Sequence, residues 1–268
     1  MKNRLHQLAA AAVLSIASLS AHAAFDLTIN YTGPSQYQSY FTAAENFWES
    51  VITGYKPTVT LTGFTITATI ENIDGQWGTL GSAGPDTITS KSGTWYTKTA
   101  SMRFDLADMA YMTSSGTFGD VIRHEMGHTI GIGTLWGYNG LYVDGSGQYT
   151  GANALAQYKT EFNQPSATFV PVELGGGPGT AGGHWNEVDN GSGLTGITDS
   201  QGRDMRNELM TGWLNAPTFV SKTTVASLQD LGYTVNMNAV PEPETYALFA
   251  LGLPVLLRFG KRRKSAAA

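Results

Sequence analysis

The segment TFGDVIRHEMGHTIGIG, residues 117–133, contains the pattern that decides the fold and the chemistry of this chain. Its apolar residues recur at roughly helical intervals over 118–130, and Gly131 follows directly. Thr117, three residues before Asp120, is typical of an N-terminal helix cap, and glycine commonly ends a helix. The pattern therefore predicts a capped helix over 118–130.

Two histidines and a glutamate on this predicted helix form a metal-ligand pattern. Residues four apart lie above one another on a helix face, so the imidazoles of His124 and His128 can reach one metal ion. Glu125, next to the first histidine, points towards a water molecule held at such an ion. The chain has no cysteine, so any metal must be bound by His, Asp or Glu. The pattern is typical of half of a zinc site.

A catalytic zinc normally has a third protein ligand and a fourth position open to water. Two of the five histidines lie in a predicted N-terminal signal, which leaves His184 as the remaining candidate. It follows the flexible stretch GGGPGTAGG, residues 175–183, which allows a distant segment to approach the helix. We therefore predict His184 as the third ligand. Glu187 and Asp189 are the alternatives, because a carboxylate also completes such a site.

The surrounding chain predicts a mixed domain of helices and strands. The region 131–183 is dominated by loop signals, and long loops in compact domains are usually functional. We expect a cleft near 131–136. The pattern predicts strands over 25–31, 59–70 and 99–104, helices over 35–53, 152–162 and 223–231, and a Gly/Ser/Thr-rich loop or hairpin over 75–93.

Both ends of the chain have the layout of sorting segments. Residues 1–23 contain two early basic residues, an apolar stretch and an Ala-His-Ala site, as in a secretory signal; the alternative is an N-terminal helix of the fold. Residues 240–268 begin with VPEP, continue with twelve uncharged residues and end in a basic cluster. Twelve residues are fewer than the roughly 17 to 25 that span a bilayer. By the positive-inside rule, residues 24–239 face outward.

The C-terminal segment resembles the PEP-CTERM sorting signal, with its VPEP box, short hydrophobic helix and basic end; the alternative is a plain membrane-anchored tail. The resemblance implies export across the inner membrane of a Gram-negative bacterium, an exosortase-type sorting machinery as partner, and transient membrane anchoring. It also implies a place at the cell surface or in the extracellular matrix, with extracellular polysaccharide as a further partner. Residues 24–239 have nine basic and nineteen acidic residues, which gives no footprint for nucleic acid.

The motifs HEMGHTIGIGTLW, GGHWNE, RNELMTGWLN and TTVASLQDLGY, in this order, resemble the leishmanolysin group of metzincin zinc peptidases. The likeness is strongest over residues 104–235. It implies an α+β catalytic domain over 24–239, with an N-terminal twisted mixed sheet, an active-site helix and an irregular, loop-rich C-terminal subdomain. Thr134 stands where many metzincins have the third histidine, so the role of His184 depends on a long insertion.

The resemblance also implies a role for each motif residue. The Zn²⁺ ligands are His124, His128 and His184, the general base is Glu125, the glycine that turns the chain after the helix is Gly131, and the Met-turn methionine beneath the metal is Met210.

These roles predict a secreted zinc metalloendopeptidase that acts on protein or peptide substrates. The metal polarises the scissile carbonyl and activates a bound water, whose proton Glu125 takes and later delivers to the leaving amine. One alternative is an extracellular matrix or adhesion module with a structural or catalytically silent metal site. Another is a zinc hydrolase acting on a non-protein amide. Trp136 and Trp185 either shape substrate binding or belong to the core.

Overall fold

The computed structural model describes residues 25–187 and 193–240. The predicted signal segment, the predicted tail from residue 241 onward and Asp189 lie outside these residues. None of the helices in the two described ranges has the length and apolar content needed to cross a bilayer.

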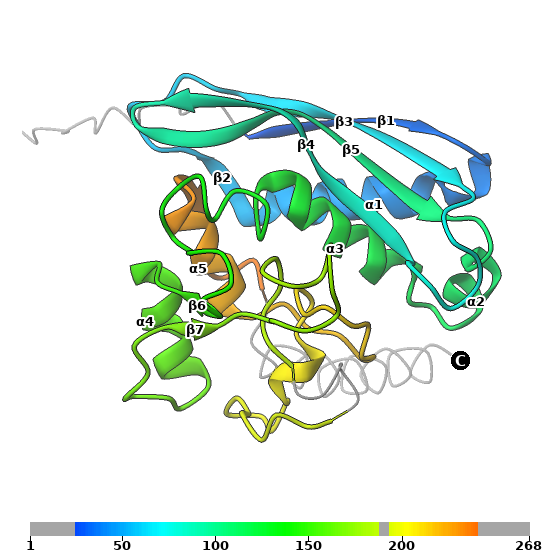
Figure 1. Ribbon diagram of the computed structural model, residues 1–268. Coiled ribbons are helices and arrows are strands. Elements are labelled where there is room, and N and C mark those ends of the chain that lie inside the picture. Colours follow the sequence, from blue (N-terminus) through cyan, green and yellow to red (C-terminus); the bar gives the residue numbers. More distant parts are fainter. Residues whose placement is uncertain (1–24, 188–192, 241–268) are drawn as a thin grey trace, which may run out of the picture.

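A four-stranded sheet forms the upper layer in Figure 1. Its first three strands in spatial order are parallel, and the fourth is antiparallel and lies at the edge. The chain is therefore a mixed α+β protein with a sheet of mixed strand direction, as predicted. The spatial order is β1 (Asp26–Thr32), β3 (Gly63–Glu71), β5 (Thr94–Asp105) and β4 (Gly81–Lys91).

Two helices cover the lower face of this sheet (Figure 1). Helix α1 (Gln38–Val51) buries Phe41, Ala44, Trp48 and Val51, whose spacing of three or four residues places them on one face. Helix α3 (Phe118–Ile130) packs against α1, β4 and β5. The Trp48 indole donates a hydrogen bond of 2.9 Å to the Arg123 carbonyl oxygen. This bond fixes the depth of α3 against α1.

The predicted helix over 35–53 differs from the structure at both ends. It begins with a 3₁₀ turn, Ser35–Tyr37, and the α-helix ends two residues before residue 53. Residues Ile52–Tyr55 instead form β2, which pairs antiparallel with β8 (Tyr233–Val235). Pairing with a distant segment of the chain therefore overrides the local helical pattern.

The strand predictions are right in type and less accurate in extent. The strand predicted over 59–70 begins only at Gly63, and the one predicted over 99–104 is the middle of the longer strand β5. For 75–93 the hairpin alternative is correct, because β4 pairs with β5 across the turn at Ser92 and Gly93. Helix α2 (Met109–Ser114) was not predicted.

The C-terminal part of the described chain is loop-rich, as expected. Its longer elements, α4 and α5, lie close to the lengths predicted for them and pack against each other. Its elements before β8 are β6 (Gln148–Tyr149), α4 (Ala152–Glu161), β7 (Val170–Pro171), the 3₁₀ helix η2 (Met205–Asn207) and α5 (Lys222–Asp230).

Helices α4 and α5 cap each other. The Asp230 carboxylate, at the end of α5, accepts hydrogen bonds from the backbone N–H groups of Asn153 and Ala154 in the first turn of α4. The Glu161 carboxylate, at the end of α4, accepts from the backbone N–H groups of Lys222 and Thr223 in the first turn of α5. Each carboxylate therefore satisfies donors that a helix start leaves without partners.

Trp136 and Trp185 are core residues. Both are 0% exposed, and their rings stack at 4.7 Å between centroids. The Trp185 indole donates to the Thr224 hydroxyl at 2.8 Å. The interpretation that these two residues shape substrate binding is therefore wrong, because neither side chain reaches the cleft.

Candidate metal centre

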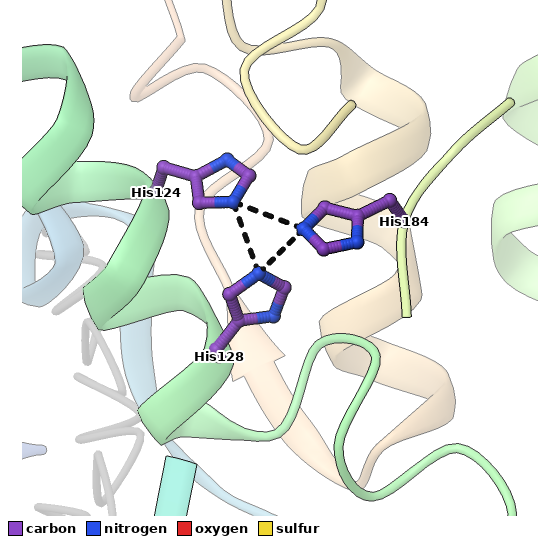
Figure 2. A group of neighbouring side chains, drawn as sticks. All are labelled: His124, His128 and His184. Atoms are coloured by element: carbon purple, nitrogen blue, oxygen red, sulfur yellow. Dashed lines mark hydrogen bonds between the residues drawn. The ribbon is translucent and has the colours of Figure 1, made fainter. Parts of the chain in front are cut away.

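Helix α3 presents His124 and His128 on the same face (Figure 2). It ends at Ile130, and the backbone N–H of Gly131 donates to the carbonyls of Gly127 and His128. Gly131 has φ of 122°, a conformation that favours glycine, so the chain turns here as predicted.

Thr117 is the N-cap residue of α3, as predicted, but the side-chain capping that its residue type suggested is absent. The Thr117 side chain makes no cap hydrogen bond to the helix. Its hydroxyl lies 2.8 Å from the Ser115 hydroxyl instead. The backbone carbonyl of Thr117 accepts from the Asp120 N–H at 2.9 Å, so the helix starts through its main chain alone.

His184 reaches the helix on a segment that is held from both sides by main-chain hydrogen bonds. Its carbonyl accepts from the Glu173 N–H at 2.9 Å, and the next residue, Trp185, donates its N–H to the Met210 carbonyl at 3.0 Å. The turn after α3 lies against this segment: a methyl group at Gly133 would be 2.1 Å from the Gly183 carbonyl oxygen. Only glycine permits this approach, which brings His184 beside α3.

The three imidazoles converge through their Nε2 atoms. These atoms are 3.1 Å apart between His124 and His184, 3.0 Å apart between His128 and His124, and 3.0 Å apart between His128 and His184 (Figure 2). The structure thus brings together three buried or partly buried histidines that are close enough to bind one metal ion. All three were predicted as ligands from the sequence.

Hydrogen bonds to the opposite ring nitrogens fix the protonation of these histidines. The Nδ1 atoms lie 2.6 Å, 2.9 Å and 2.8 Å from the carbonyl oxygens of Leu209, Ile132 and Thr180, respectively. A carbonyl oxygen only accepts, so each Nδ1 carries the hydrogen and each neutral ring presents a lone pair at Nε2. Three facing lone pairs cannot hydrogen-bond to one another. A cation is the partner that satisfies all of them.

The donor set also fits zinc in its distances. Tetrahedral zinc with bonds of about 2.0 to 2.1 Å to nitrogen separates neighbouring ligand atoms by about 3.3 to 3.4 Å. The Nε2 separations of 3.0 to 3.1 Å are within a few tenths of an ångström of that value. Each imidazole also donates its Nδ1 hydrogen to a carbonyl oxygen, as metal-bound histidines almost always do.

The carboxylate alternatives for the third ligand have different outcomes. Glu187 is buried, but its Oε1 accepts a hydrogen bond of 2.7 Å from the Trp213 N–H, and it does not belong to the converging group. Asp189 lies outside the described residues. Thr134 donates its hydroxyl hydrogen to the His128 carbonyl at 2.7 Å, which supports the helix end.

Burial sets the charge of the side chains at this site. Desolvation lowers the pKa of His124, and it lowers the pKa of His184 to about 3. The pKa of His128 lies well below its usual value because of burial first and the two neighbouring imidazoles second. Without a metal, all three rings are therefore neutral at pH 7, which is the form that binds a cation.

Glu125 lies beside the histidines with its carboxylate uncommitted. The side chain lines the cleft, and among the described residues it has no hydrogen-bond or ion-pair partner. Burial raises its pKa to about 8 in the absence of a metal, and a neighbouring cation would lower it. This carboxyl group can therefore accept and release a proton near neutral pH.

Met210 packs against α3 at Gly127. It is fully buried, and a methyl group at Gly127 would lie 2.8 Å from its sulfur. The thioether thus occupies the space that glycine leaves on α3. This position is compatible with the hydrophobic floor predicted for Met210.

Glu208 is a structural residue of this site that the sequence reasoning missed. Its carboxylate is buried and accepts hydrogen bonds from the Met210 N–H, from the N–H and hydroxyl of Ser221, and from the Thr224 hydroxyl. It therefore ties the segment carrying Met210 to the start of α5. The next residue, Leu209, supplies the carbonyl that accepts from His124. The sequence does contain a signal for a structural role of Glu208: it is a lone carboxylate directly before the uncharged run LMTGWLN.

The pKa of Glu208 predicts a pH-dependent contribution to stability. Burial raises this pKa to about 7, although the hydrogen bonds that the carboxylate accepts lower it in part. The pKa of Glu208 is thus higher in the folded protein than in the unfolded chain, where it is about 4.5. The stability that this group contributes is therefore fully present below pH 4.5 and is lost as the pH rises through about 7. Glutamine does not titrate, so the unfolding free energy of the parent should fall relative to that of Glu208→Gln as the pH rises from about 4.5 to above 7. The expected fall is on the order of 3 kcal/mol. Denaturant titrations with chelator present would measure it, and a constant difference would refute it.

The histidines and Glu125 lie in a cleft of about 1050 Å³. Gly133 and Thr134, from the region 131–136 where the cleft was expected, line it. One wall is the start of the edge strand β4, from Gly81 to Ala83. The other walls come from the loops after α3 and around His184, and include Tyr138, Tyr142 and Trp213.

Comparison of the sequence with protein-family models and with curated proteins finds no match.

Proposed function

We propose that this chain is a secreted zinc metalloendopeptidase with a metzincin-like catalytic domain over residues 24–239, similar to the leishmanolysin group. The observation that carries the proposal is the arrangement around α3. Three Nε2 lone pairs face one point, and the Glu125 carboxylate lies beside them in an open cleft without a protein partner among the described residues.

The residues divide the chemistry between them. His124, His128 and His184 would hold Zn²⁺, which when bound polarises the scissile carbonyl and makes water more acidic. Glu125 accepts the proton of the attacking water and passes it to the nitrogen of the leaving amine. Gly131 and Met210 support the helix and its ligands.

The edge strand supports a peptide as the substrate. Among the described strands, β4 pairs only with β5, and its first residues border the cleft. An extended peptide can add to such an edge through main-chain hydrogen bonds. Pro85 has no N–H, so this pairing would be confined to the three β4 residues that line the cleft, Gly81 to Ala83. A small non-protein amide would not use this strand.

The alternative is an extracellular matrix or adhesion module with a structural or silent metal site, and it rests on the predicted sorting tail. A structural zinc usually has four protein ligands. The described residues supply three, and the carboxylate beside them has no hydrogen-bond or ion-pair partner among the described residues. We also propose export, exosortase-type processing and association with polysaccharide, as the two ends of the sequence predict.

Hydrolysis of an unfolded protein tests this function. The purified full chain, loaded with zinc, should cleave casein, lose this activity with a chelator such as 1,10-phenanthroline, and regain it when zinc is restored. Stoichiometric zinc with no cleavage of casein would favour the matrix or adhesion module. Cleavage that survives complete removal of the metal would refute the proposed site.

A further inference from the structure

Gly81, the first residue of β4, lies directly against Glu125. A methyl group at this position would be 2.8 Å from Glu125 Oε1, 2.9 Å from Cγ and 3.0 Å from Cδ. All three atoms belong to one side chain, and real Cβ atoms essentially never approach another atom as closely as the first two of these distances. A side chain at position 81 would therefore displace Glu125.

The backbone itself does not require glycine here. Gly81 is absent from the residues with positive φ, and it pairs with Phe104 in the regular register of the β4–β5 ladder. Alanine could adopt this conformation without strain. The constraint at position 81 therefore comes from the space that Glu125 occupies.

The contact involves the stem of Glu125 as well as its tip. If only Oε1 were close, rotation of the carboxylate would relieve the contact. Because Cγ also lies within 2.9 Å of the added atom, relief needs a change in the torsions nearer the main chain. Such a change moves the whole carboxylate. No protein hydrogen bond from the described residues would hold it in place.

We propose that Gly81 is a positioning residue for the general base: the absence of a side chain there sets where the Glu125 carboxylate lies. This inference rests on the proposed peptidase function. A general base must come within about 2.6 to 3.2 Å of the group whose proton it takes, and a misplacement of about 1 Å can cost on the order of 10²-fold in rate.

The test compares Gly81→Ala with Gly84→Ala in the zinc-loaded full chain. Gly84 lies on the same strand, and a methyl group there would meet only a Thr134 carbon at 3.6 Å, an ordinary contact. Gly81→Ala should lower kcat for a casein-derived peptide by on the order of 10²-fold, with KM and zinc content unchanged. Gly84→Ala should stay within about twofold of the parent.

A crystal structure of Gly81→Ala gives a readout that does not need activity, and it should show Glu125 displaced from its parent position. An undisplaced Glu125, or a kcat equal to that of the parent, would overturn the inference and leave the peptidase proposal intact. Loss of the fold or of zinc in Gly81→Ala alone would also overturn it, since Gly81 would then serve stability. A parent protein that cleaves nothing would instead refute the function itself.

Discussion

Glu125→Gln is expected to lower kcat by about 10²- to 10⁴-fold while the zinc content of the protein is unchanged. Glutamine keeps the size of the side chain, which fits between α3 and Gly81, but it cannot accept the proton of an attacking water. The three imidazoles do not hydrogen-bond to Glu125, so their positions should persist. Steady-state cleavage of a fluorogenic peptide, together with metal analysis of the same sample, measures both quantities.

Glu161→Gln is a matched control for this experiment. Glu161 is a partly buried glutamate whose pKa is also raised by burial, but it caps α5 and does not line the cleft. Its replacement should reduce stability and leave kcat close to that of the parent. If Glu125→Gln cleaved as fast as the parent, Glu125 could not be the base.

His184→Ala is expected to abolish stable metal binding and hydrolysis together. Only two nitrogen donors would remain on α3, and two ligands do not form the usual three-ligand catalytic site. The loss in affinity should exceed the roughly 10- to 100-fold that follows removal of an outer hydrogen-bond partner of a metal ligand. Competition with a chromophoric zinc chelator measures the affinity.

The control for His184→Ala lies two residues further along the same segment. The main chain of Asn186 bonds to Pro171, but its side chain makes no hydrogen bond with the described residues, so Asn186→Ala should bind zinc like the parent. Full zinc occupancy and activity in His184→Ala would show that a different side chain completes the site.

The helix and its ligands could be predicted because their pattern is local. The spacing of His124 and His128 fixes their common face, and the glycine after the helix marks its end. His184 could be predicted only by elimination. The contact that places it, between Gly133 and Gly183, joins residues far apart in the chain.

Other features depend on tertiary contacts that no local pattern contains. Strand β4 has few apolar residues and is held by its pairing with β5, so its sequence resembles a loop. Glu208 receives most of its hydrogen bonds from residues 221 and 224, which only the fold brings near. Thr117 has the residue type of a cap, but its hydroxyl has a competing partner in Ser115.

The mutual capping of α4 and α5 has a consequence for local unfolding. Fraying at the start of either helix removes the hydrogen bonds of a carboxylate at the end of the other, so the two helices should open as one cooperative unit. The same first turn of α5 supplies the donors that hold Glu208, and Leu209 follows Glu208 in the chain. Loosening of this helix pair would therefore reach the backbone carbonyl that orients the first histidine of α3.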